Sequence, residues 1–93
     1  MNKIEKLTLI EDDFSVNEAK EILNNIYFSK INFHNIKNWS SQERFGKDDA
    51  IAQKRIPALK NEMKKLEEIL SEAKANNKKL LVSSEITISL VDH

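Results

Sequence analysis

The chain contains no cysteine, one glycine and one proline among its 93 residues. The lack of cysteine excludes disulfides, thiol chemistry and cysteine-ligated zinc, and it suits a reducing compartment such as the cytoplasm. A single glycine cannot build a glycine-rich phosphate loop. So little glycine and proline also argues against an all-β sandwich, because seven or eight strands need many tight turns.

Net charge and long apolar runs are missing as well. Fifteen Lys and Arg balance fifteen Asp and Glu, so no overall field attracts nucleic acid or an anionic membrane. No window approaches the roughly 18 apolar residues of a membrane span, and residues 1–13 lack the apolar run of a signal peptide. The length and a hydrophobic content of 40% predict one domain, residues 1–93.

Residues that could support catalysis or metal binding are few. His34 and His93 are the only histidines, and no second ligand stands at a metal-binding spacing from either. The acidic run 11–13 favours a turn before a helix start over a cation site, because no EF-hand spacing follows it. Ser40 and Ser41 lack the GxSxG frame of a nucleophile. We therefore expect no enzyme, no metal site and no cofactor.

The strongest helical pattern lies in residues 59–77. Its apolar residues recur at steps of four and three, which makes one narrow stripe of Leu59, Met63, Leu66, Leu70 and Ala73. We predict a helix from about 49 to 76, capped by Asp48 and ended by a left-handed Asn77. Pro57 predicts a kink or a short break within it. A stripe this narrow needs a partner surface.

A first helix is predicted from about 16 to 38. Ser15 and Glu18 form a capping box, with Phe14 placed to pack on the first turn against Ala19. The apolar stripe continues through positions 19, 22, 26, 29, 33 and 36. Residues 29–36 also alternate like a strand, but the stripe stays in phase there and favours the helix.

The connection between the helices spans residues 39–47. Ser40 and Glu43 form a second capping box, which predicts one short helical turn. Gly46, the only glycine, suits a left-handed helix end.

Two strands complete the chain. Residues 80–91 alternate between apolar and polar side chains, and residues 4–11 place Leu7 and Leu9 on one face before the acidic run 11–13 ends the strand. The fold class is therefore α+β in the order β-α-α-β, a long antiparallel helical hairpin packed on one face of a two-stranded antiparallel sheet. The predicted core is Leu7, Leu9, Ile22, Ile26, Phe33, Leu59, Met63, Leu66, Leu70, Val82, Ile86 and Ile88.

Two groups of residues are candidates for binding a partner. Trp39, Arg44, Phe45 and Gly46 concentrate in the predicted connection, where they would form either a binding loop or a plug for the end of the hairpin, and the plug is favoured. Five basic residues lie off the stripe of the second helix: Lys54, Arg55, Lys60, Lys64 and Lys65. A solvated helix face is the commoner cause of such a group, and nucleic-acid binding or a regulatory role is the alternative.

The sheet itself predicts self-association. A two-stranded sheet is marginal alone, and the edge from Ser83 to Leu90 carries one charge, Glu85, with neither proline nor lysine to discourage pairing. We predict a non-enzymatic interaction module that forms a homodimer. The dimer would form either through strand edges, giving a four-stranded sheet, or through the hairpins, giving a four-helix bundle.

Overall fold

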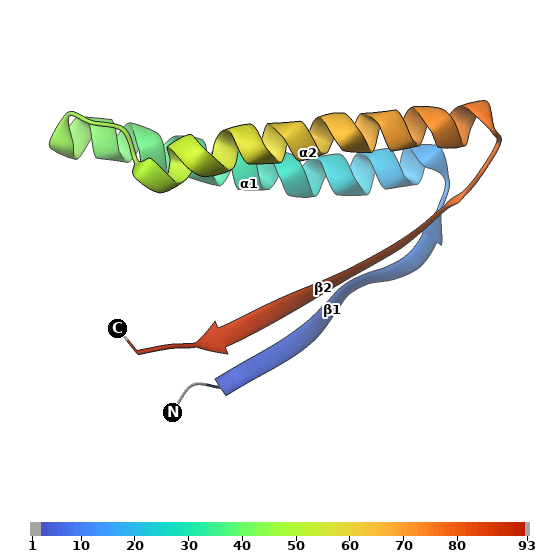
Figure 1. Cartoon of the computed structure of the whole chain (residues 1–93), viewed down its shortest axis with the longest axis horizontal. Helices are drawn as coiled ribbons and strands as arrows, with labels where there is room; N and C mark the ends of the chain where they lie inside the picture. Colours follow the sequence, from blue (N-terminus) through green and yellow to red (C-terminus); the bar gives the residue numbers. More distant parts are fainter. Residues whose placement is uncertain (1–2, 93) are drawn as a thin grey trace.

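The computed structural model of the protein describes residues 3–92 and contains four elements in the order β1-α1-α2-β2 (Figure 1). Strand β1 spans Lys3–Phe14, helix α1 Val16–Phe45, helix α2 Ala50–Ala75 and strand β2 Leu80–Leu90. The helices lie side by side as a hairpin, and the strands form a two-stranded antiparallel ribbon. The predicted α+β fold is confirmed. His93 lies outside the described residues.

Helix α1 begins at the predicted capping box. The backbone N–H of Ser15 donates to Oε1 of Glu18 at 2.9 Å, and the N–H of Glu18 donates to Oγ of Ser15 at 3.2 Å. The backbone N–H of Ser15, and after it the Ser15 side chain, hold the pKa of the Glu18 carboxyl below its ordinary value, because the charged carboxylate accepts hydrogen bonds better than the neutral acid. Phe14 packs on the cluster of Ala19, Leu66 and Leu70, as expected for a residue preceding the cap.

The same helix continues well past its predicted end at residue 38. Residues 29–36 are helical, as predicted, but the expected short turn started by Ser40 and Glu43 does not form, because α1 runs through both. No glycine or proline lies between Ser15 and Gly46, so nothing in the backbone stops a helix that is already propagating. Gly46 ends it in the predicted left-handed conformation (φ 67°), and its N–H donates to the carbonyl of Gln42 at 2.9 Å.

Helix α2 is capped by Asp49 rather than by Asp48. The Asp49 side chain accepts the N–H of Ala52 at 2.9 Å. Pro57 introduces no break: the helix is continuous from Ala50 to Ala75. Buried residues on either side of Pro57, Ala52 and Leu59, hold both parts against α1.

The end of α2 follows the prediction. Asn77 takes the left-handed conformation (φ 52°). The N–H of Lys78 donates to the carbonyl of Ala73 at 2.8 Å, and that of Asn77 to Lys74 at 3.3 Å. This pair of bonds is a Schellman motif, with asparagine where glycine is usual.

The hairpin core is a narrow seam between the two helices. On α2 the buried side chains follow steps of three and four, and they are Ala52, Leu59, Leu66, Leu70 and Ala73. On α1 the buried side chains are Ala19 and Ile31. Ala19 and Ala52 are fully inaccessible to solvent, and their small side chains allow close packing at those points. The seam confirms Leu59, Leu66 and Leu70 of the predicted core.

The ribbon contains one irregularity that decides which side chains share a face. The strands pair from Lys3 opposite Leu90 to Phe14 opposite Leu80, with a bulge between Thr8 and Ile10 that leaves Leu9 without a partner. Residues directly opposite each other project to the same face. Leu7 (opposite Ile86) and Ile10 (opposite Ser84) therefore share the apolar face, although one is odd and the other even. The prediction that Leu7 and Leu9 form a regular apolar pair is wrong.

The acidic run 11–13 does not end β1. Asp12 pairs with Val82 and Asp13 with Leu81, so the strand continues to Phe14. The ladder to β2 holds these residues extended despite their poor strand propensity.

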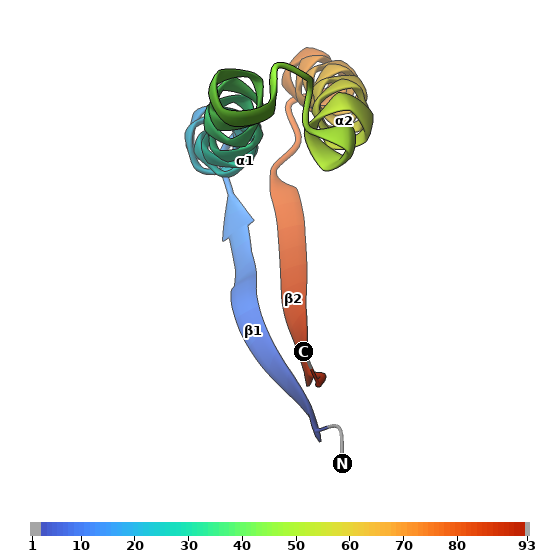
Figure 2. The ribbon, with the colours of Figure 1, turned by 90° about the vertical axis from the view of Figure 1, so that its left-hand side faces the viewer.

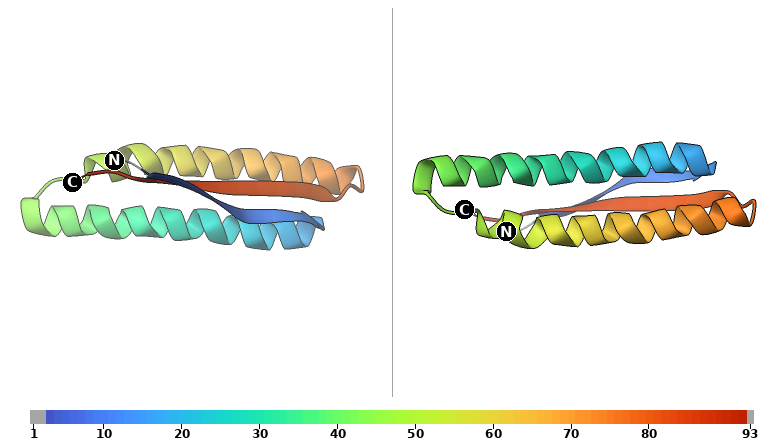
Figure 3. Two further views of the ribbon diagram at one scale, coloured as in Figure 1. Left: turned by 90° about the horizontal axis from the view of Figure 1, so that it is seen from below. Right: turned by 90° about the horizontal axis from the view of Figure 1, so that it is seen from above.

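Only the part of the ribbon beside the start of α1 is covered by the hairpin. Ile10 is buried, and Phe14 and Leu80 pack against the hairpin core. Farther out the ribbon diverges from the helices (Figure 1) and twists, so that near the termini β1 crosses in front of β2 in the view from below (Figure 3, left) and lies farther from the helices than β2. There the ribbon turns an edge, and not its apolar face, toward the hairpin.

This divergence corrects half of the predicted core. Six of its members are exposed: Leu7, Leu9, Ile22, Phe33, Ile86 and Ile88. Three are half-buried, namely Ile26, Met63 and Val82. The buried residues absent from the prediction are Ile10, Ala19, Ile31, Ala52 and Ala73, four of which are either alanine or part of the bulged strand.

Candidate interaction surfaces

The candidate binding loop is not a loop. Trp39, Arg44 and Phe45 belong to the last two turns of α1, and only Gly46 lies in the connection. At about 100° per residue the three side chains leave the helix on different sides, so the fold does not gather them into one site. Trp39 and Phe45 are 63% and 70% exposed. Neither plugs the hairpin, and that interpretation is wrong.

Polar side chains close the end of the hairpin instead. The Oδ1 atom of Asn38 accepts the backbone N–H of Asp49 at 2.8 Å, and Nε2 of Gln42 donates to Oδ1 of Asp48 at 2.6 Å. Gln53 adds a longer bond to Asn38, at 3.4 Å. Sequence reasoning missed this network because side chains that are close in space here are spread over residues 38 to 53.

The five basic residues of α2 are all exposed but do not share one face. From the helical repeat, Lys60 and Lys64 lie on one side, Lys54 and Lys65 about a quarter to a third of a turn away, and Arg55 farther round. Lys65 also contacts Glu62, with Nζ 3.7 Å from Oε1. The basic side chains are thus spread around the helix with acidic neighbours among them.

The outer half of the ribbon carries the clearest exposed apolar surface. Four side chains on its apolar face lie beyond the cover of the hairpin, and we call them the outer ribbon face: Leu7, Ile86, Ile88 and Leu90. Their exposed fractions run from 39% to 58%. Strand β2 keeps its alternation here, with Thr87 and Ser89 on the opposite face. Strand β1 does not keep it, because Lys3 and Glu5 share the face of the four apolar side chains and Ile4 lies with Lys6 on the opposite face.

A second apolar stripe lies on α1 and consists of the exposed residues Ile22, Phe33 and Ile36 and the half-buried Ile26. In Figure 2, α1 runs toward the viewer, with α2 on its right and the ribbon below. In a right-handed helix this stripe lies roughly a third of a turn from the seam, on the side of the ribbon. Ile22 is 36% exposed and Ile26 is half-buried, whereas Phe33 and Ile36, where the ribbon has moved away, are 53% and 58% exposed.

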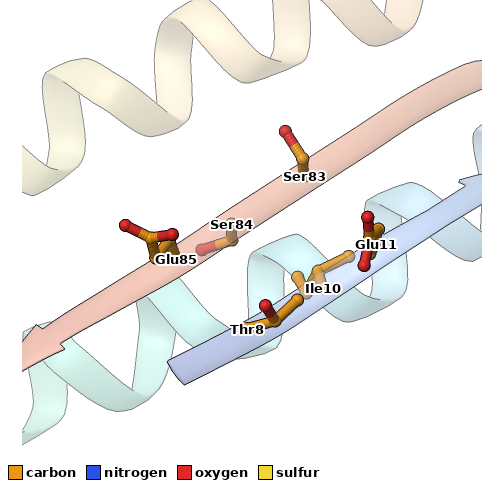
Figure 4. A pocket seen from close by; sticks show the side chains of 6 residues that line it. All are labelled: Thr8, Ile10, Glu11, Ser83, Ser84 and Glu85. Atoms are coloured by element: carbon orange, nitrogen blue, oxygen red, sulfur yellow. The ribbon is translucent and has the colours of Figure 1, made fainter. Parts of the chain in front are cut away.

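A shallow hollow of about 230 Å³ lies at the bulge, lined by Thr8, Ile10, Glu11, Ser83, Ser84 and Glu85 (Figure 4). Its polar groups are hydroxyls and two carboxylates, so it offers hydrogen-bond acceptors and negative charge. Among residues 3–92, no three His, Cys, Asp or Glu side chains are grouped so that they could hold a metal ion.

In the described part of the chain, neither helix has an apolar stretch long enough to cross a bilayer. No protein-family model, no curated protein and no solved structure matches this chain.

Proposed function

We propose that this protein is a non-enzymatic interaction module that works as a homodimer, in which a second copy covers the outer ribbon face and the α1 stripe. The single observation that carries the proposal is the excess of solvent-accessible surface. The chain exposes 7809 Å², whereas a compact protein of 10.8 kDa exposes about 5,500 Å².

The shape gives the same indication. The radius of gyration is 16.8 Å, against about 12 Å for a compact chain of this length, and the molecule is only 15 Å across its shortest axis. A molecule this thin leaves both faces of the ribbon close to solvent.

The size of the excess accessible surface favours a second copy of the chain as the partner that covers it. Each chain has about 2,300 Å² more surface than a compact one, so two chains could bury about 4,500 Å² between them. That is within the range of obligate homodimers, whose interfaces resemble a domain core cut in half. An identical partner also brings apolar surfaces of the same size, and the zero net charge of the chain does not oppose association.

Sedimentation equilibrium at micromolar concentration tests the proposal. The expected mass is twice the 10.8 kDa of one chain. A single-chain mass at every concentration would overturn the homodimer. Salt-sensitive binding of the single chain to short nucleic acids would then favour the alternative based on the basic residues of α2.

A further inference from the structure

We infer that the two copies join through their β2 strands, paired antiparallel across a two-fold axis near Ile86, to form a four-stranded sheet in the order β1-β2-β2-β1. This inference rests on the proposed homodimer and specifies its interface. The two copies join at the strand edge, and neither the helices nor the flat faces of the ribbons form the joining surface.

The two free edges of the ribbon differ in how well they discourage pairing. In the two-stranded sheet each strand has one neighbour, so each leaves a row of backbone N–H and C=O groups without a strand partner. Strand β1 carries six charged side chains: Lys3, Glu5, Lys6, Glu11, Asp12 and Asp13. Strand β2 carries a single charged side chain, Glu85. Charges along an edge oppose pairing with another chain, so β2 is the edge open to a partner.

Pairing at this edge also covers the outer ribbon face. Because a two-fold axis reverses the strand direction, the outer half of one β2 strand comes to lie beside the inner half of the other. With the axis at Ile86, Leu90 faces Val82 of the partner subunit and Ile88 faces Ser84 of the partner subunit. The outer half of each β2 strand thereby enters the region that the partner's hairpin covers. The even-numbered apolar residues of both β2 strands stay on one face of the sheet.

Parity and charge restrict the position of the axis. Even-numbered residues of β2 form its apolar face, so an arrangement that keeps both apolar faces together pairs even residues with even ones. An axis at Glu85 would place two carboxylates directly opposite each other, which is unfavourable. An axis at Ile86 places Glu85 opposite Thr87 of the partner subunit and removes that repulsion.

The absence of cysteine makes a cross-linking test direct. Ile86→Cys places a thiol near the axis, where opposite Cβ atoms are about 4.5–5.5 Å apart and a disulfide can close with small adjustments. Leu7→Cys is the matched control, since Leu7 lies directly opposite Ile86 on the same face and is also exposed. In the proposed sheet, two copies of residue 7 are three strand spacings apart, about 14 Å.

Mild oxidation should link Ile86→Cys into a covalent dimer at least tenfold faster than Leu7→Cys. Mixing Ser84→Cys with Ile88→Cys should give a mixed disulfide dimer, which fixes the register and remains informative if Ile86→Cys folds poorly. Circular dichroism of the reduced variants verifies that each keeps its helices.

The outcomes separate the inference from the proposed function. A single-chain mass for the unmodified protein overturns both. A dimer in which Leu7→Cys links as fast as Ile86→Cys overturns edge pairing in favour of ribbons packed face to face, and leaves the homodimer intact. A dimer in which Phe33→Cys links, and the β2 variants do not, overturns edge pairing in favour of contact through the α1 stripe.

Discussion

Helix α2 of the hairpin and strand β2 of the ribbon have equally regular apolar patterns but very different burial. In the hairpin, Leu59, Leu66 and Leu70 are nearly inaccessible to solvent, because two helices can lie along each other for their whole length. In the ribbon, Ile86, Ile88 and Leu90 follow an equally clean alternation and remain exposed, because the ribbon twists and diverges from the helices. A periodic pattern therefore predicts which face avoids water, but it does not identify the surface that covers that face.

The largest expected effect tests the hairpin side of this comparison. Leu66→Ala removes a buried side chain from the seam and should lower the free energy of unfolding by about 2–5 kcal/mol. Denaturant titration followed by circular dichroism measures the loss. A loss under about 1 kcal/mol would show that the seam does not carry the stability of the hairpin.

A smaller effect is expected where the two helices join. Asp49→Ala removes the acceptor for the N–H of Ala52 and should cost about 0.5–2 kcal/mol. Asp48→Ala is the control, because Asp48 bonds to Gln42 on the exposed surface and caps no helix. Thermal unfolding of both variants decides which aspartate caps α2. An equal or larger loss of stability in Asp48→Ala would assign the cap to Asp48.

The ribbon should respond differently to the same kind of truncation. In the single chain, Ile88→Ala should cost less than about 1 kcal/mol, because the side chain is already 42% exposed. If a second copy covers the Ile88 side chain, the stability lost in Ile88→Ala should grow with protein concentration. The stability lost in Leu66→Ala should depend far less on protein concentration. Unfolding midpoints measured over a hundredfold range of concentration make this comparison. Concentration-independent losses for both variants would mean that nothing covers the outer ribbon face.

The smallest expected effect lies where ribbon and hairpin meet. Hydrogen bonds from Ser15 lower the pKa of Glu18, so the stabilisation is complete above the unfolded-state pKa and is lost as the pH falls through the lower folded-state pKa. Glu18→Gln should remove this acid dependence and leave the rest of the profile unchanged. Unfolding titrations between pH 3 and 7 are the measurement, and an unchanged acid limb would assign the dependence to other carboxyls.

The sequence was sufficient to predict the order of the elements, the α2 stripe and the helix ends at Ser15, Gly46 and Asn77. Each of these depends on neighbouring residues, which a local pattern describes well. The failed capping box at Ser40 shows the limit of such patterns. Ser40 has the same motif as Ser15, but it lies inside a helix that already propagates, where adding a residue costs much less than starting a turn.

The exposed half of the ribbon could not be predicted for a different reason. Leu7 and Ile88 have the alternation of core residues, and nothing local in the chain shows that the ribbon diverges from the hairpin. The candidate partner-binding residues Trp39 and Phe45 were assigned to a connection because α1 was expected to end too early. In both cases the missing information concerns the relative placement of distant segments.

The bulge in β1 has a consequence for how related chains would align with this one. Leu9 is the extra residue, so losing it would restore a regular ladder and leave the other side chains of β1 on their present faces. A one-residue gap at positions 8–9 is therefore a conservative change, whereas a gap within residues 10–14 would shift the register and turn side chains of the covered half to the opposite face. Homologues that differ in length near the N-terminus should place the difference at that point.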